Sequence, residues 1–207
     1  TGLIGATNRG AGGRCNTNRR RRVNDRGDVR SWCKAAVERV ATAEARRVPQ
    51  FEVAARCYQV WWSLRPGQIP ARSDLDPLRF GAELLPHLTI IDVLHPERDY
   101  RWRLCGEQAI AAIGTPLRGK RLQDLEHDLG EAILFREALD EVVRTRQPLF
   151  YVLRHHTLQG LLRRSYGVLL PLLATGHETG PETGPAATSP SAGITHILGA
   201  FDWATGE

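Results

Sequence analysis

Two carboxylates and an arginine lie close together in the segment Ile69–Pro77, which reads IPARSDLDP. Asp74 and Asp76 could act as general acid and base, because such catalysis uses two carboxylates in different environments near one substrate. A structural role is favoured over catalysis, since aspartate followed by proline is typical of a helix N-cap. We expect Arg72, Asp74 and Asp76 to form a structural clasp that fixes the preceding helix on the domain, with catalysis as the alternative.

The seven histidines and four cysteines show no spacing typical of a metal site. The sequence contains no H-x-x-x-H, H-E-x-x-H or C-x-x-C pattern, and we therefore expect no bound metal. Free thiols are typical of a reducing compartment. The N-terminal residues lack the apolar core of a secretory signal, and no apolar run reaches the ~20 residues of a membrane helix. We expect a cytoplasmic protein without membrane contact.

Charge is distributed unevenly along the 207 residues. Residues 1–50 contain 12 Lys/Arg and 4 Asp/Glu, whereas residues 51–207 contain 16 and 19. Residues 1–28 combine high charge with low hydrophobicity, which predicts a disordered basic tail. Since the folded part is mildly acidic, nucleic-acid binding is not expected of it, and binding through Arg19–Arg22 of the tail is an alternative.

The hydrophobic pattern predicts an α+β fold. Residues 29–66 are expected to form two N-terminal helices, 29–48 and 51–64. Residues 67–207 are expected to form a domain with a five-stranded antiparallel sheet, in which helices are inserted between strands two and three. The strands are predicted at 88–94, 99–106, 149–157, 162–173 and 194–203. Residues 174–193 are rich in Gly, Pro and Thr, and we expect a flexible insertion there.

The helix at 51–64 is unusually apolar, with ten apolar residues in fourteen. Its own domain is not expected to cover so broad a surface, and exposed aromatic faces often mark interfaces. We therefore predict a homodimer through this helix. The interface residues are expected to be Phe51, Tyr58, Trp61 and Trp62. The alternative is that the predicted helix 29–48 folds back and covers the second face.

Several segments together resemble the PAS domain, and more closely a subfamily of small bacterial PAS proteins with an (L/I)PxRSD(I/L)DP lead-in. The matching segments are IPARSDLDP (69–77), LLPHLTIIDVL (84–94), YRWRLCGEQ (100–108), GTPLRGKRLQDL (114–125) and ILGAFDW (197–203). The resemblance covers residues 51–203. It implies a sensory or interaction module whose sheet and helical side enclose a ligand. The long loop before the last strand and the arginine-rich tail depart from the family pattern.

This resemblance implies a pocket for a small, largely apolar ligand between the sheet and the helix bearing Phe135. Strand alternation places further side chains on the same surface. The candidate pocket residues are Trp102, Leu104, Phe135, Tyr151, His155 and Tyr166. We expect no cofactor. The Asn-Cys-Arg-Phe motif of flavin-binding relatives is absent, and His127, between two acidic residues, is expected at the surface rather than on haem.

The predicted function is a sensory or protein-interaction module that is not an enzyme. No kinase or other output motif occurs in the sequence, so signalling would pass through an unidentified protein partner. An alternative is a small α+β enzyme of the ketosteroid-isomerase type, whose helices precede the strands. Helix placement separates these two interpretations.

Overall fold

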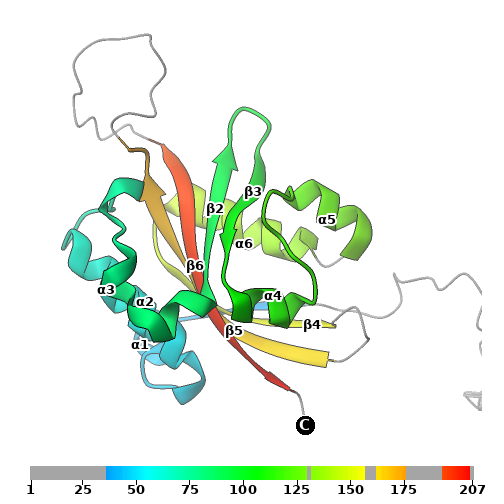
Figure 1. The fold of residues 1–207 in the computed structure, drawn as a ribbon, viewed down its shortest axis with the longest axis horizontal. Coiled ribbons are helices and arrows are strands. Elements are labelled where there is room, and N and C mark those ends of the chain that lie inside the picture. The colour runs from blue at the N-terminus through cyan, green and yellow to red at the C-terminus, as the bar shows by residue number, and fades with distance from the viewer. Residues whose placement is uncertain (1–35, 130–131, 157–161, 176–192, 206–207) are drawn as a thin grey trace, which may run out of the picture. The chain divides into compact units, whose positions relative to one another are not determined.

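The computed structural model describes residues 36–129, 132–156, 162–175 and 193–205. Six strands form one antiparallel sheet in the order β1-β4-β5-β6-β2-β3 (Figure 1). The strands are β1 (Ala36–Val40), β2 (Leu88–Leu94), β3 (Asp99–Cys105), β4 (Leu149–His156), β5 (Leu162–Leu173) and β6 (Ile194–Thr205). The predicted tail, 1–28, and most of the predicted insertion, 174–193, lie outside the described residues.

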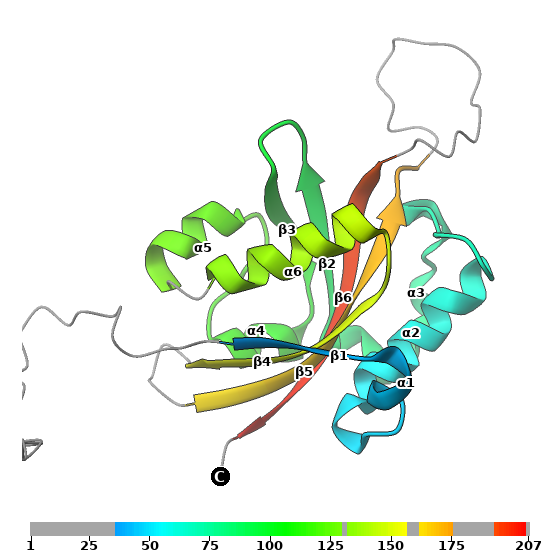
Figure 2. The same cartoon turned by 180° about the vertical axis from the view of Figure 1, so that it is seen from behind.

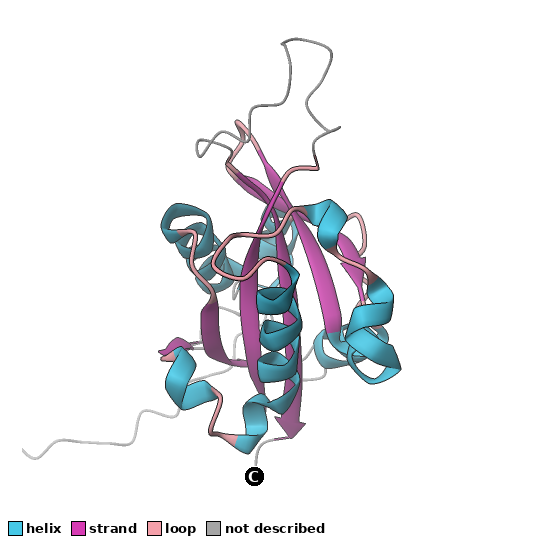
Figure 3. Cartoon of the chain, turned by 90° about the vertical axis from the view of Figure 1, so that its left-hand side faces the viewer, coloured by secondary structure: helices cyan, strands magenta, loops and turns pink. Residues whose placement is uncertain are grey.

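Helices cover both faces of this sheet. They are α1 (Thr42–Ala45), α2 (Glu52–Leu64), α3 (Pro77–Leu84), α4 (Glu107–Ile113), α5 (Leu122–Leu129) and α6 (Ala132–Thr145). Helices α2 and α3 lie on one face, which we call the α2 side (Figure 3). Helices α5 and α6 lie on the opposite face, the α6 side (Figure 2). Among the helices of the described ranges, none combines the length and hydropathy that a bilayer-spanning segment requires.

Each face of the sheet has its own hydrophobic core, because successive strand residues point to opposite sides. On β4, Phe150 and Val152 pack on the α2 side, whereas Tyr151 packs on the α6 side. On β5, Val168 and Leu169 divide in the same way. A strand buried on both faces carries a nearly continuous apolar run, which explains the sequence GVLLPLL in β5.

The predicted α+β class and antiparallel sheet are confirmed, and β2 and β5 have the predicted bounds. Helices α4 to α6 lie between β3 and β4, which are strands two and three of the prediction. The predicted number of strands was wrong, because the described residues form a sheet of six strands rather than five. The extra strand, β1, lies within the segment predicted as helix 29–48.

Residues 36–40 form a strand because their two valines pack against two different cores. In a helix Val37 and Val40 would lie on the same face. In the structure Val37 packs on the α6 side and Val40 on the α2 side, as an odd spacing in a strand requires. The strand also pairs with β4 along its whole length and so covers a sheet edge that would otherwise be open. Helix propensity is a weak preference that such pairing overrides.

Helix α2 packs on its own sheet more completely than its sequence predicts. Phe51 and Trp61 are only 2% and 3% exposed, and Trp61 Nε1 donates a hydrogen bond of 3.0 Å to the carbonyl of Pro171. Tyr58 is half-buried, with its ring centroid 5.6 Å from that of Phe150. Of the four residues predicted for the dimer interface, only Trp62 is exposed, at 47%.

Candidate functional site

Three aromatic side chains meet on the α6 side of the sheet. Trp102 of β3 stacks on Phe135 of α6, with centroids 6.3 Å apart and ring planes 14° apart. Phe135 meets Tyr151 of β4 edge to face at 5.9 Å. Trp102 and Tyr151 are 5% and 2% exposed, while Phe135 is half-buried. The structure therefore brings together three of the residues predicted to line a ligand pocket.

The ring of Tyr151 lies across the neighbouring strand at a glycine. Gly167 of β5 is paired directly with Tyr151. A Cβ atom at Gly167 would lie 2.5 Å from Tyr151 Cζ and 2.6 Å from its hydroxyl oxygen, so only glycine leaves room for the ring. Burial raises the pKa of the Tyr151 phenol, which therefore stays protonated and able to donate a hydrogen bond.

Polar contacts hold α6 over this surface. Arg136 of α6 donates to the carboxylate of Asp99 at 3.0 Å and to the carbonyl of Arg98 at 2.8 Å. One turn further along α6, Asp140 accepts a hydrogen bond from the hydroxyl of Tyr100. Burial, and then this bond, raise the pKa of Tyr100. Both contact residues follow Phe135 within α6, and they fix the position of its ring over the sheet.

A second group of side chains, the polar corner, lies at the end of the same face beside α4. It consists of Arg163 and Ser165 on β5 and Trp203 on β6, where Ser165 and Trp203 are paired. The guanidinium of Arg163 lies 3.8 Å from the centroid of the Trp203 ring and donates at 2.8 Å to the carbonyl of Ala111 in α4. Arg163 Nε, Ser165 Oγ and Trp203 Nε1 are buried, and none has a hydrogen-bond partner in the described structure.

Of the remaining predicted pocket residues, Leu104 and Tyr166 are not part of this surface. Leu104 is 42% exposed. Tyr166 points to the α2 side, where its ring centroid lies 5.4 Å from that of Phe51. His155 lies on β4, but its side chain is outside the described residues. The orientation of Tyr166 follows from the alternation of side chains along a strand: its neighbours Ser165 and Gly167 face the α6 side, so Tyr166 faces the α2 side.

The clasp residues divide between two separate contacts. Asp76 accepts a hydrogen bond of 2.9 Å from the backbone N–H of Leu78, which confirms the predicted N-cap of α3. Asp74 pairs with Arg65 just after α2, with 2.7 Å between Arg65 Nε and Asp74 Oδ2. Arg72 joins neither contact, and its buried Nε has no hydrogen-bond partner among the described residues.

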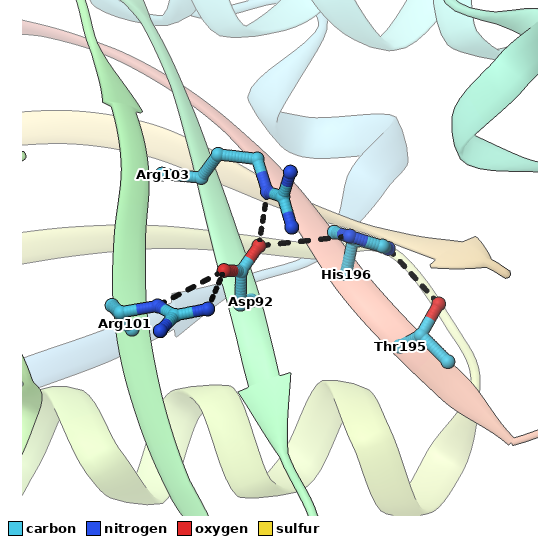
Figure 4. A network of polar contacts seen from close by, with 5 residues as sticks. All are labelled: Asp92, Arg101, Arg103, Thr195 and His196. Carbon is cyan, nitrogen blue, oxygen red and sulfur yellow. Dashed lines mark hydrogen bonds and ion pairs between the residues drawn. The ribbon is translucent and has the colours of Figure 1, made fainter. Parts of the chain in front are cut away.

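The sequence did not predict the ionic network that surrounds a buried carboxylate on the α2 side (Figure 4). Asp92 of β2 is 4% exposed and accepts hydrogen bonds from Arg103 at 2.7 Å and from Arg101 at 2.9 Å. His196 Nε2 of β6 lies 3.6 Å from Asp92 Oδ1, and Thr195 Oγ1 contacts the other ring nitrogen at 2.9 Å. One signal was available, since an acid inside the apolar run LTIIDVL needs a partner if it is buried.

The electrostatics of Asp92 reflect two opposing effects. Burial alone raises the pKa of a carboxyl group, but the hydrogen bonds from Arg103 and Arg101 outweigh it, and the pKa of Asp92 lies below its usual value. The charged carboxylate thereby joins β2, β3 and β6 on the α2 side. Because these contacts link three neighbouring strands, we regard the network as a structural clamp.

Metal-binding clusters of three or more His, Cys, Asp or Glu do not occur within the described ranges. His127 lies on α5, but its side chain is not among those described.

Residues 50–185 match the family model described as the PAS domain, which is more than half of the chain. The chain belongs to the PAS domain family, as the sequence motifs predicted. Among solved structures, it is similar to a Rhodobacter sphaeroides LOV protein, with 19% identity and a TM-score of 0.37, over 55% of this chain and 56% of that one. It is also similar to an RNA-binding Light-Oxygen-Voltage receptor, with 13% identity and a TM-score of 0.41, over 81% of this chain and 38% of that one. No curated protein matches the chain.

Proposed function

We propose that the chain is a sensory module that binds a small, largely apolar ligand on the α6 side of its sheet and signals through a protein partner. The observation that carries this proposal is the aromatic surface formed by Trp102, Phe135 and Tyr151 under α6. Apolar and aromatic side chains with a few polar groups are the usual lining of a small-molecule site. PAS domains are typically sensory or interaction modules without enzymatic activity, and membership of the family supports the same role.

A neutral, apolar fluorescent probe, N-phenyl-1-naphthylamine, tests ligand binding. We expect saturable binding to the full chain at one site, with a rise in probe fluorescence. Phe135→Leu should weaken binding about tenfold or more, because it removes the ring that joins Trp102 to Tyr151. Tyr166→Leu is the matched control, since Tyr166 is also a half-buried aromatic but points to the α2 side.

We expect Phe135→Leu, on the α6 side, to weaken probe binding and Tyr166→Leu, on the α2 side, to leave it unchanged. Equal loss of binding in Phe135→Leu and Tyr166→Leu would place the probe elsewhere and contradict the proposed site. A wild type that shows no saturable binding would contradict the ligand-binding function itself. Circular dichroism of each variant shows whether its fold is retained.

The partner of this module is proposed to include a second copy of the chain. Trp62 supports this part of the proposal, because it is exposed on α2. Helix α3 lies beside α2, and an ion pair between Glu83 and Arg56 joins the two helices. Leu78 of α3 is exposed as well. We also propose a cytoplasmic location, which agrees with the free thiols of Cys57 and Cys105.

Light scattering at tens of micromolar protein tests the dimer. We expect a dimeric wild type and a monomeric Trp62→Glu variant. Leu104→Glu is the control, since Leu104 is similarly exposed but lies on β3. A monomeric wild type, or equal effects of the two substitutions, would contradict a dimer through α2.

A further inference from the structure

The polar corner has an unusual imbalance between hydrogen-bond donors and acceptors. Arg and Trp side chains can only donate, and the hydroxyl of Ser165 can donate as well. Ser165 is 2% exposed, so water does not reach it freely. Buried polar groups in native proteins nearly always have a partner, and each exception calls for a specific explanation. Three exceptions in one corner point to a missing acceptor.

The charge of the corner favours an anion as this acceptor. Arg163 carries a permanent positive charge, but its described contacts are the carbonyls of Ala111 and Ala112 and the ring of Trp203. None of these contacts is a carboxylate. An anionic group in the corner would therefore meet a guanidinium that has no carboxylate partner among the described residues.

The corner is continuous with the aromatic surface of the proposed site. Ser165 lies two residues before Gly167 on the same face of β5, which corresponds to about 7 Å along the strand. The ring and hydroxyl of Tyr151 lie over Gly167. A ligand with its apolar part near Tyr151 and Phe135 could thus place one end beside Ser165.

We propose that the ligand of this module is a carboxylic acid with an apolar body, whose carboxylate binds to Arg163, Ser165 and Trp203. A carboxylate suits these donors because its two oxygens accept up to about four hydrogen bonds. This inference rests on the proposed ligand-binding function and adds the chemical class of the ligand. The polar corner selects the head group, and the aromatic surface holds the remainder.

Displacement of bound N-phenyl-1-naphthylamine tests the inference with two matched series of probes. The first series contains straight-chain carboxylates of about six to twelve carbons, and the second contains alcohols of the same lengths. We expect the best carboxylate to displace the dye at a concentration at least about tenfold lower than its matched alcohol, because hydrogen bonds to charged groups are the stronger ones.

Variants locate the origin of this preference. Ser165→Ala and Arg163→Gln should each remove most of the carboxylate preference, while dye binding persists. Arg164→Gln is the control, since it removes the same charge from the adjacent, exposed residue that faces the α2 side. Arg163→Gln also removes the hydrogen bonds to α4. If Arg163→Gln fails to fold, Ser165→Ala alone tests the carboxylate preference.

Each outcome bears on a distinct claim. Alcohols that displace the dye as well as carboxylates, or a failure of both series to displace it, would overturn carboxylate recognition and leave the dye-binding site standing. Unchanged preference in Ser165→Ala and in a folded Arg163→Gln would also overturn it. Absence of dye binding in the wild type would overturn the proposed function and this inference together.

Discussion

Two adjacent tryptophans on α2 allow a sharp test of how this helix is stabilised. Trp61 is 3% exposed and donates a hydrogen bond to the carbonyl of Pro171, whereas Trp62 is 47% exposed. Trp61→Ala removes a buried aromatic side chain and leaves that carbonyl without its partner. Such substitutions cost about 3–5 kcal/mol of unfolding free energy. Trp62→Ala removes mainly contacts with the rings of Tyr58 and Trp61, for which we expect about 1 kcal/mol.

Urea unfolding followed by far-UV circular dichroism measures this difference. With an m-value of roughly 2 kcal/mol/M, Trp61→Ala should lower the midpoint by about 1.5–2.5 M and Trp62→Ala by about 0.5 M. Trp61→Phe keeps an aromatic ring but loses the hydrogen bond, and it should fall between the two. Equal midpoints for Trp61→Ala and Trp62→Ala would refute the packing of α2 on the sheet. Low protein concentration keeps any dimer from contributing to the measured stability.

Two further predictions concern the sheet. Gly167→Ala should destabilise the fold by about 1–3 kcal/mol, because its Cβ would lie 2.5 Å from Tyr151 Cζ. In the Tyr151→Ala background the same substitution should cost less. Strictly additive losses of unfolding free energy in the two single variants would show that the ring is not the cause. Asp92→Asn should be less stable than the wild type by about 1 kcal/mol at pH 7, since the arginine partners of Asp92 are partly in water. The pKa of Asp92 is lowered in the folded state, so its contribution is present above about pH 4 and is lost as the pH falls through the lowered pKa. A stability difference between wild type and Asp92→Asn that stays constant from pH 7 to pH 3 would contradict this assignment.

Much of the fold follows from local sequence patterns. The run LTIIDVL predicts β2, and Asp76 before Pro77 predicts the start of α3, because β-branched residues and N-caps act through their immediate neighbours. The spacing of apolar residues predicts the helices between β3 and β4. The PAS motifs then predicted the family, which the family model confirms. Trp102, Phe135 and Tyr151 were likewise predicted on one surface, and the structure brings them together.

Only the tertiary structure decided which surfaces those elements share. Residues 36–40 have a helical pattern, but the open edge of β4 and a core on each face of the sheet make them a strand. Trp61 and Trp62 are adjacent residues of the same type, so their sequence does not distinguish them; the packing of α2 buries Trp61 and exposes Trp62. Arg163, Ser165 and Trp203 meet only because β5 pairs with β6 beneath α4. Such contacts join residues far apart in the chain, so no local pattern encodes them, and they form only when the sheet and its two helical layers assemble.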